Sequence, residues 1–271
     1  MSYWSNKVAL VTGGSAGLGL AIAEALITQG ARVAIVARDR ERLAAAVEKL
    51  SDGTSDVRIL GITADVTQQS DVVRMIAETI DTFGRIDLLV NNAGSSMRGE
   101  VLSTPPEEFT RLFEVNFLSM VRATQAAAPH LLTSRGHVVN IGSLASKSTS
   151  RYLGAYPASK FPVAALSQQL RFELEPGGVH VLLVCPGPIK RHDATPRYQH
   201  QTAELPASAQ EPGAGAKIRG IEAGRLATMI LRACQRKQAE LVVPWRAKIL
   251  FTILQIWPRL GDWIIERMIR K

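Results

Sequence analysis

The residues that most clearly suggest chemistry are a phenol and an ammonium, Tyr156 and Lys160, in the segment YPASK (156–160). Residues four apart share one face of an α-helix, so both groups can reach the same spot. Pro157 lacks an N–H and fits only in a first turn, which predicts that Tyr156 begins the helix. A nearby cation favours phenolate and lowers the pKa of tyrosine, which is about 10 when unperturbed. The pair could therefore exchange protons with a substrate, although the same spacing also occurs on solvated helix faces.

A glycine-rich segment, TGGSAGLG from Thr12 to Gly19, follows an apolar strand-like run and precedes a helical pattern. Glycine lets the backbone approach a phosphate closely, and the N-terminus of the following helix favours an anion. Tight strand-to-helix turns also use glycine without any ligand. In this context the segment predicts a phosphate-binding loop.

The elements that position these residues alternate between short apolar runs and longer helical patterns. Uniformly apolar strands that alternate with helices indicate a parallel sheet covered on both faces. We therefore expect an α/β fold of one domain, a Rossmann fold whose doubly wound, mainly parallel sheet has about seven strands. Strands are expected at 7–12, 31–37, 57–65, 86–94, 136–143, 179–187 and 240–244, and helices near 17–30, 40–50, 69–83, 107–132, from Tyr156 onward and near 221–236.

Three motifs together resemble the short-chain dehydrogenase/reductase family. They are TGxxxGxG at 12–19, NNAG at 91–94 and the Tyr156-xxx-Lys160 pair, and the resemblance spans roughly residues 5 to 190. It implies hydride transfer between a nicotinamide and a carbonyl or alcohol group, with Tyr156 as general acid/base. Lys160 would also reach the nicotinamide ribose.

The resemblance extends to two further catalytic positions, Asn116 in FEVNFLS and Ser143 in NIGSLAS. Ser143 would hold the substrate oxygen, and Asn116 would hold a water behind Lys160 in a proton relay. Each residue also has a structural interpretation. Ser143 could shape a turn at a strand end, and the Asn116 amide could bond to neighbouring backbone.

The expected dinucleotide is NADP, because the second strand ends in Ala37 followed by Arg38. An acidic residue there would bind a ribose 2′-hydroxyl, whereas an arginine can pair with a 2′-phosphate. NAD is the alternative, and Asp39 is expected to cap the next helix. The positions that match the family's cofactor-binding residues are Gly13, Ser15, Gly17, Leu18, Gly19, Arg38, Asp65, Val66, Asn92, Ala93, Gly94, Tyr156, Lys160, Pro186, Gly187 and Ile189. Asp65 could equally cap a turn.

Composition limits the partners. The 271 residues carry a net charge of +8, which fits a nucleic acid, an anionic membrane or a phosphorylated ligand. Of these partners we expect no nucleic acid. Two cysteines in apolar runs suit reduced thiols and a cytoplasmic location, and no signal peptide is apparent. The five histidines lack ligand-like spacing, so no metal is expected. We expect a homodimer or homotetramer, although the sequence does not fix the number of subunits.

The chain divides into two regions. We assign residues 1–244 to the dinucleotide-binding domain, with a substrate lid in the Pro-, Ala- and Gln-rich stretch 191–219, and 245–271 to an amphipathic tail. The tail holds three of the four tryptophans, six basic residues and two acidic ones, and its apolar run is too short to span a bilayer.

The tail could lie in a membrane interface or pack against its own domain or a sister subunit. Either use favours a lipophilic substrate. The alternative function is a low-turnover dinucleotide-binding protein that is attached to a membrane or partner through this tail.

Overall fold

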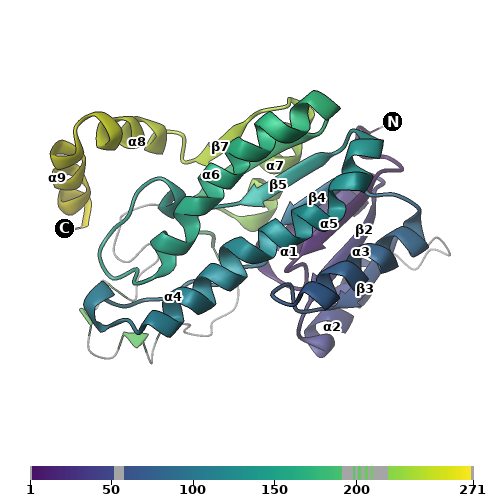
Figure 1. Ribbon diagram of the computed structural model, residues 1–271, viewed down its shortest axis with the longest axis horizontal. Coiled ribbons are helices and arrows are strands. Elements are labelled where there is room, and N and C mark those ends of the chain that lie inside the picture. Colours follow the sequence, from purple (N-terminus) through teal and green to yellow (C-terminus); the bar gives the residue numbers. More distant parts are fainter. Residues whose placement is uncertain are drawn as a thin grey trace.

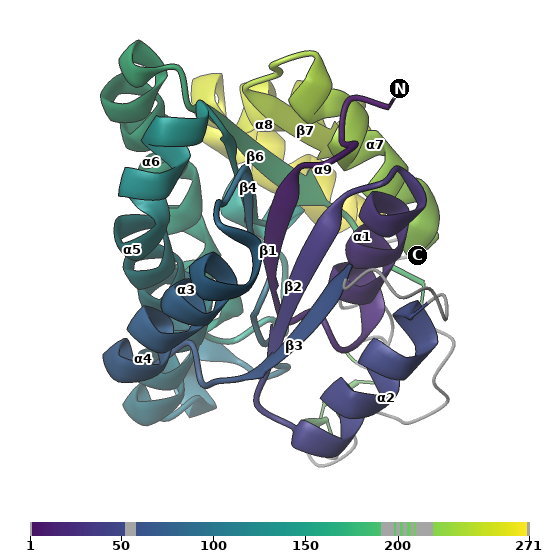
Figure 2. The same ribbon diagram turned by 90° about the vertical axis from the view of Figure 1, so that its right-hand side faces the viewer.

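A parallel sheet of seven strands in the order β3-β2-β1-β4-β5-β6-β7 forms the centre of the molecule (Figure 2). The computed structural model describes residues 2–51, 58–190, 198, 201–202, 205–206, 209 and 219–269. All six neighbouring strand pairs are parallel, which confirms the predicted fold class. The strands are β1 (Val8–Thr12), β2 (Arg32–Ala37), β3 (Ile59–Thr63), β4 (Leu88–Asn91), β5 (His137–Ile141), β6 (His180–Pro186) and β7 (Glu240–Val243).

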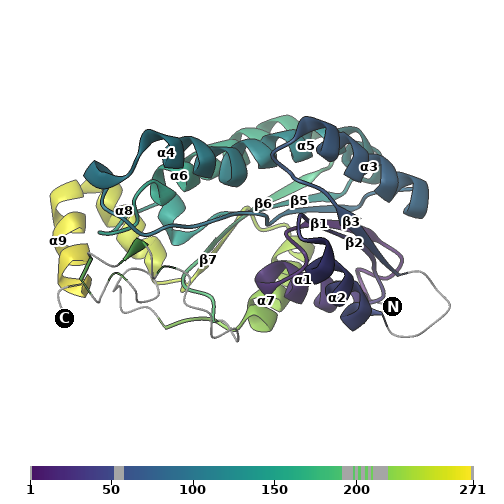
Figure 3. The same cartoon turned by 90° about the horizontal axis from the view of Figure 1, so that it is seen from below.

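Helices cover both faces of the sheet (Figure 3). One layer contains α3 (Gln69–Phe83), α4 (Pro106–Phe113), α5 (Ser119–Ser134) and α6 (Tyr156–Leu174). The opposite layer contains α1 (Gly17–Thr28), α2 (Arg40–Leu50) and α7 (Ala223–Gln235). Right-handed crossovers explain why α1 and α2 lie on one face and α3, α5 and α6 on the other, because the strand order reverses between β1 and β4.

The sheet has a hydrophobic core on each face because side chains alternate along a strand. In β1, Ala9 and Val11 pack into the core beneath α1 and α7, whereas Val8 and Leu10 pack into the core beneath α3 and α5. All four side chains are buried. Double burial explains why the strands are uniformly apolar in the sequence.

The helical region expected at 107–132 differs from the prediction in one respect. It is helical from Pro106 to Ser134, but a π-helical turn at Glu114–Leu118 separates α4 from α5. A π turn inserts an extra residue and rotates the side chains that follow it. Asn116 lies within this turn.

Two further helices, α8 (Ala247–Ile256) and α9 (Pro258–Ile269), form the end of the chain and lie away from the N-terminus (Figure 1). Phe251 of α8 is buried in a small core that includes Val163 of α6 and Cys185 of β6. An ion pair of 3.3 Å joins Arg151, in the loop before α6, to Glu266 of α9. None of the described helices has both the length and the apolar character needed to cross a bilayer.

Candidate active site

Most of the predicted site residues gather at one edge of the sheet, because parallel strands end there together. In strand order these residues follow or close six strands: the glycine loop after β1, Arg38 after β2, Asp65 and Val66 after β3, Asn92, Ala93 and Gly94 after β4, Ser143 after β5, and Pro186, Gly187 and Ile189 at β6. The edge thus brings together segments that are far apart in the sequence.

The glycine loop has the shape of a phosphate cradle. Gly13 and Gly17 have φ values of +65° and +55°, which favour glycine, and a Cβ on Gly17 would meet no atom within 4 Å. Helix α1 begins at Gly17, and its N-cap residue, Ala16, offers no side-chain acceptor. The first N–H groups of α1 are therefore left for an external anion, which fits the pyrophosphate of a dinucleotide. Ser15 lies in this loop, whereas the Leu18 side chain is buried, so Leu18 could contact a cofactor only through its backbone.

Asn92 fixes the loop to the end of β4. Its Nδ2 donates to the carbonyl oxygens of Thr12 at 2.9 Å and Gly13 at 3.0 Å. The backbone N–H groups of Asn92 and Ala93 both donate to Thr12 Oγ1. The NNAG motif therefore holds the glycine loop in place, besides ending a strand on the cofactor side.

Gly94 marks the point where two catalytic candidates approach each other. A Cβ on this residue would lie 2.8 Å from Asn116 Oδ1 and 3.6 Å from Lys160 Nζ. Only glycine leaves room for the Asn116 side chain at its present distance. The spacing also shows that Asn116 and Lys160 lie on the same side of the β4 end.

Arg38 lies at the end of β2 and is largely exposed, with Nη1 3.8 Å from Asp65 Oδ2. Such an exposed, long ion pair contributes little to stability, so the guanidinium can still bind another anion. Asp65 Oδ1 also accepts from the N–H of Thr67, which is the turn-capping role left open in the sequence analysis. Val66 is buried. Asp39 caps α2 by accepting from the N–H of Arg42, as expected.

Tyr156 is the first residue of α6, as the position of Pro157 predicts. Burial raises the pKa of the phenol, and the hydrogen bond with the Ser143 side chain and the charge of Arg98 act in the opposite direction. This differs from the expectation that Lys160 lowers the pKa of Tyr156. The phenol is therefore protonated at neutral pH and is set to donate a proton.

Lys160 lies one turn further along α6 and is almost completely buried. Its Nζ donates to the carbonyl oxygen of Ile141, the last residue of β5, at 2.9 Å. This bond directs the ammonium toward the strand end. Burial lowers the pKa of Lys160 to about 8, so the side chain is still mostly charged at neutral pH.

Ser143 caps the short helix Leu144–Ser146 at the end of β5. Its Oγ accepts from the N–H of Ala145 at 3.1 Å, and its own N–H donates to Ser146 Oγ. This is the strand-end turn considered in the sequence analysis. An interaction with the Ser143 side chain also lowers the pKa of Tyr156, so the two side chains lie close together. That Ser143 holds the substrate oxygen stays a prediction.

Asn116 is fully buried in the π turn, and its side chain is extensively bonded. Oδ1 accepts from the N–H of Ser95, while Nδ2 donates to the Ser95 carbonyl and to Ser159 Oγ. Both Nδ2 hydrogens are thus used, and the amide bonds to neighbouring backbone, the alternative role given above. Any water held by the side chain must donate to the second lone pair of Oδ1.

Pro186 closes β6, and both Gly187 and Ile189 beyond it contact neighbouring segments. The N–H of Gly187 donates to the Val243 carbonyl, and Ile189 forms a bridge with Ile221. The substrate lid expected at 191–219 falls mostly outside the described residues.

Comparison with known proteins decides the family, because a family model described as short chain dehydrogenase matches residues 7–202. The chain belongs to the short chain dehydrogenase family. Its oxidoreductases act on alcohol and carbonyl groups and use NAD(P). The resemblance noted from the three sequence motifs is confirmed.

Three similar proteins illustrate the range of the family. An uncharacterized oxidoreductase, YxnA from Bacillus subtilis, is 31% identical over 97% of this chain and 72% of its own. L-fucose dehydrogenase from Bos taurus is 36% identical over 75% of this chain and 72% of its own. The structure of L-sorbose reductase from Gluconobacter frateurii, complexed with NADPH and L-sorbose, has a TM-score of 0.77 at 26% identity and covers 88% of this chain and 95% of that one.

One charged residue near Tyr156 of this short chain dehydrogenase was not predicted from the sequence. Arg98 is buried, and it donates to the carbonyl oxygens of Met97 and Ala209 while its guanidinium lies 4.3 Å from the Tyr198 ring centre. Its neighbour Gly99 bridges to Leu153, three residues before Tyr156. The sequence offered one indication of this role, because Arg98 follows the NNAG motif by a few residues.

The spatial arrangement of the histidines also differs from what their spacing in the sequence suggests. Two of them, His137 and His180, are the first residues of neighbouring strands and lie together with Cys234 of α7. Their sequence separation gives no hint of this. The group lies at the opposite edge of the sheet from the glycine loop and Tyr156.

Proposed function

We propose that this chain is an NADP(H)-dependent oxidoreductase that interconverts a carbonyl and an alcohol, with Tyr156 as general acid/base. The observation that supports the proposal is the grouping of the Tyr156 phenol, the Ser143 hydroxyl and the buried Lys160 ammonium at the carboxyl end of β5. A bound nicotinamide supplies or accepts the hydride. The protein residues then need only orient the substrate oxygen and move one proton.

Each residue has one task in this proposal. Ser143 donates to the substrate oxygen and holds it beside the phenol. Tyr156 donates its proton to that oxygen during reduction and accepts one during oxidation. Lys160 binds the ribose hydroxyls of the cofactor, and Asn116 keeps the Ser95 loop and Ser159 in register behind it.

Replacing the phenol tests the proposal directly. Tyr156→Phe removes the proton donor and should lower turnover by at least about 100-fold, because general acid/base catalysis contributes that much or more. NADPH binding, measured by fluorescence titration, should change little. Tyr152→Phe, a tyrosine in the preceding loop, is the control and should keep its activity. Equal turnover of the Tyr156→Phe enzyme and the wild type would contradict the role of Tyr156.

The choice of NADP is supported by Arg38 at the end of β2. Its side chain is 72% exposed, and the ion pair that it forms with Asp65 is long, so it can turn toward a 2′-phosphate. Arg38→Asp should reverse the ratio of the NADPH and NADH dissociation constants, since a carboxylate repels the phosphate and accepts from a ribose hydroxyl. Arg42→Asp, in the exposed first turns of α2, is the charge-matched control. An unchanged ratio in Arg38→Asp would remove the support for NADP.

A lipophilic substrate is our proposal for the substrate class. Large apolar side chains are exposed on α8 and α9, and the Arg151–Glu266 pair joins α9 to the loop that leads into Tyr156. Two relatives carry names of sugar-converting enzymes, which makes sugars the competing class. A panel of long-chain ketones and of ketoses of similar size, assayed for NADPH consumption, separates the classes. Higher kcat/KM with the ketoses would contradict the proposal.

We propose that residues 245–271 attach the 1–244 domain, from the cytoplasmic side, to a negatively charged membrane surface. Exposed apolar side chains of this segment, on α8, on α9 and between them, include Ile249, Ile256, Trp257, Leu260 and Trp263. Basic side chains accompany them, and Arg267 lies 4.1 Å from the Trp263 ring centre. Aromatic, aliphatic and basic residues in such a mixture suit a helix in a membrane interface.

Flotation with vesicles that contain anionic lipid tests the attachment. The wild type should float with the vesicles, and Trp257→Glu/Trp263→Glu should stay at the bottom of the gradient. The pair Asp262→Asn/Glu266→Gln, which makes the tail more basic, should float at least as well. If neutral and anionic vesicles recover the wild type equally poorly, the apolar surface is instead a contact with protein, such as a second subunit in a homodimer or homotetramer.

The competing function is a dinucleotide-binding protein of low turnover that uses the same tail for attachment. The presence of Asn116, Ser143, Tyr156 and Lys160 together argues against it, because binding alone does not need a proton donor. Tight NADPH binding without consumption by any ketone or ketose in the panel would favour this alternative.

A further inference from the structure

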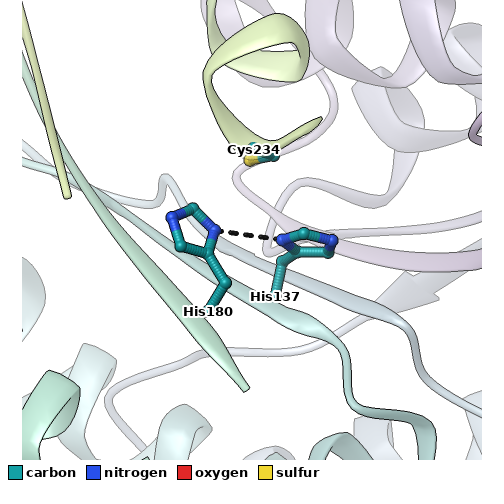
Figure 4. A group of neighbouring side chains, drawn as sticks. All are labelled: His137, His180 and Cys234. Carbon is teal, nitrogen blue, oxygen red and sulfur yellow. Dashed lines mark hydrogen bonds between the residues drawn. The ribbon is translucent and has the colours of Figure 1, made fainter. Parts of the chain in front are cut away.

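A group of three metal-ligating side chains lies at the amino ends of β5 and β6, apart from the proposed active site (Figure 4). His137 and His180 are direct partners across the two parallel strands, and Cys234 belongs to α7. All three residues are buried, and Cys234 forms no disulfide. The two Nδ1 atoms are 3.0 Å apart, and one ring nitrogen of each histidine and Cys234 Sγ all lie within 4.8 Å of one another.

The outer nitrogen of each imidazole has a partner of its own. His180 Nε2 lies 2.8 Å from the Gln238 carbonyl oxygen, and His137 Nε2 lies 2.7 Å from the Tyr3 hydroxyl. A carbonyl can only accept, so His180 carries its proton on Nε2 and its Nδ1 is a free lone pair. His137 then donates from Nδ1 to that lone pair. A single proton lies between the two inner nitrogens.

We propose that His137 Nδ1, His180 Nδ1 and Cys234 Sγ bind one Zn²⁺ ion. Imidazole and thiolate are the ligands that zinc prefers, and hard ions such as Mg²⁺ and Ca²⁺ favour oxygen. Zn–N bonds of about 2.0 Å in a tetrahedral site put two nitrogens about 3.3 Å apart, so the histidine pair needs to open only slightly. The Gln238 carbonyl and the Tyr3 hydroxyl would orient the imidazoles, as groups hydrogen-bonded to the ligands do at known zinc sites.

Zinc binding at this site releases one proton to solvent. Cys234 loses its thiol proton to solvent, and the ion forms the Zn–S bond in its place. His137 moves its proton from Nδ1 to Nε2, which then donates to the Tyr3 oxygen. His180 keeps its proton on Nε2. The cluster changes from neutral to a net charge of +1.

The surroundings allow entry of the ion. A cavity of about 480 Å³ is lined by both histidines, Tyr3 and Glu175, and it offers an entry path and room for a water in the fourth position. Lys7 and Lys237 lie close enough to His137 to repel a cation, which the Cys234 thiolate and Glu175 offset.

Co²⁺ and Zn²⁺ titration of the full-length, reduced protein tests the site, because Co²⁺ reports its ligands by absorption. We expect one Co²⁺ per chain with a thiolate-to-cobalt charge-transfer band and the strong ligand-field bands of four-coordination, all lost when one equivalent of Zn²⁺ is added. Cys234→Ser should lose the charge-transfer band. Cys185→Ser, which removes the other buried thiol, should keep it.

Two results would overturn the proposal. One is wild-type protein with no charge-transfer band at a tenfold excess of Co²⁺, and the other is a band of equal strength in Cys234→Ser. Since the wild-type titration decides without any variant, misfolding of Cys234→Ser would not protect the proposal. Zn²⁺ should also raise the unfolding temperature of wild type and Cys185→Ser, because an ion that binds only the folded state stabilises it. None of these measurements depends on NADPH turnover.

Discussion

Lys160 keeps a charge inside the protein, and this charge has a cost for folding. Its pKa is about 8 in the folded chain and 10.5 as a free side chain. The unfolded chain therefore holds more protons between these two values, and the free energy of unfolding rises with pH in that window. Below pH 8 the full cost of about 3 kcal/mol applies. A catalytic ammonium is thus expected to be retained at the expense of stability.

Lys160→Met tests this cost, since methionine fills the same space without a charge. The variant loses the hydrogen bond to Ile141, worth about 1 kcal/mol, so we expect a net gain of about 2 kcal/mol in the free energy of unfolding at pH 7. The gain should disappear above pH 10.5. Urea denaturation at the two pH values measures it. A variant that is less stable than wild type at pH 7 would show that the ammonium stabilises the fold.

Arg98 affects the pKa of the Tyr156 phenol. The charge of Arg98 lowers the pKa of Tyr156. The isolated β-bridge between Gly99 and Leu153 keeps Arg98 and Tyr156 near each other. Alcohol oxidation needs the phenolate, so its rate rises with pH through the pKa of Tyr156. In Arg98→Gln we expect the midpoint of this rise to move to higher pH.

The control for this prediction is Arg98→Lys, which keeps the charge and should keep the midpoint. The pH dependence of kcat/KM for alcohol oxidation is the measurement. Arg98 also donates to the Ala209 carbonyl, so the overall rate can fall for structural reasons. The midpoint separates the two effects, and an unshifted midpoint in Arg98→Gln would mean that its charge does not act on Tyr156.

At the scale of elements, the glycine loop depends on the contact between Gly19 of α1 and Gly13. A Cβ on Gly19 would lie 2.2 Å from the Gly13 carbonyl oxygen, so Gly19→Ala must push the loop away from the helix. We expect NADPH affinity to fall at least tenfold, about 1.4 kcal/mol. Gly224→Ala in the first turn of α7, where a Cβ meets nothing within 4 Å, is the matched control. Fluorescence titration of NADPH measures both, and equal affinities would contradict the contact.

The strands and most helices could be predicted from the sequence because burial on both faces of a parallel sheet leaves a plain pattern of apolar runs. The strand ends then placed Ser143, Asn92 and Arg38 at one edge without further information. The π turn at Glu114–Leu118 could not be predicted, since apolar periodicity does not distinguish π from α over five residues.

Contacts between residues far apart in the sequence could not be predicted either. His137 and His180 meet only because β5 and β6 pair in a particular register, and the partners of Asn116 come from the Ser95 loop and α6. The direction of the Tyr156 pKa was misjudged for the same reason. Its environment depends on burial, on Arg98 and on the turn of Lys160 toward Ile141, none of which the spacing of Tyr156 and Lys160 reveals.

At the scale of the whole molecule, a buried side chain of the C-terminal helix α8 packs against α6. Phe251 of α8 packs with Val163 of α6, while Ile249 on the same helix is 54% exposed. Deleting a buried aromatic ring from a core costs about 3–5 kcal/mol. Because most large apolar side chains of α8 and α9 are exposed and Phe251 is buried, we expect much of the Phe251→Ala effect to appear as local opening of these two helices.

Amide hydrogen exchange checks this expectation. In Phe251→Ala the amides of α8 and α9 should exchange at least tenfold faster than in wild type, while those of β1 and β4 should change much less. Ile249→Ala removes an exposed side chain from the same helix and should leave the rates unchanged. A uniform increase over the whole chain would instead mean that α8 unfolds only together with the sheet. In that case the tail would be part of the dehydrogenase core, and any membrane contact would involve the domain as a whole.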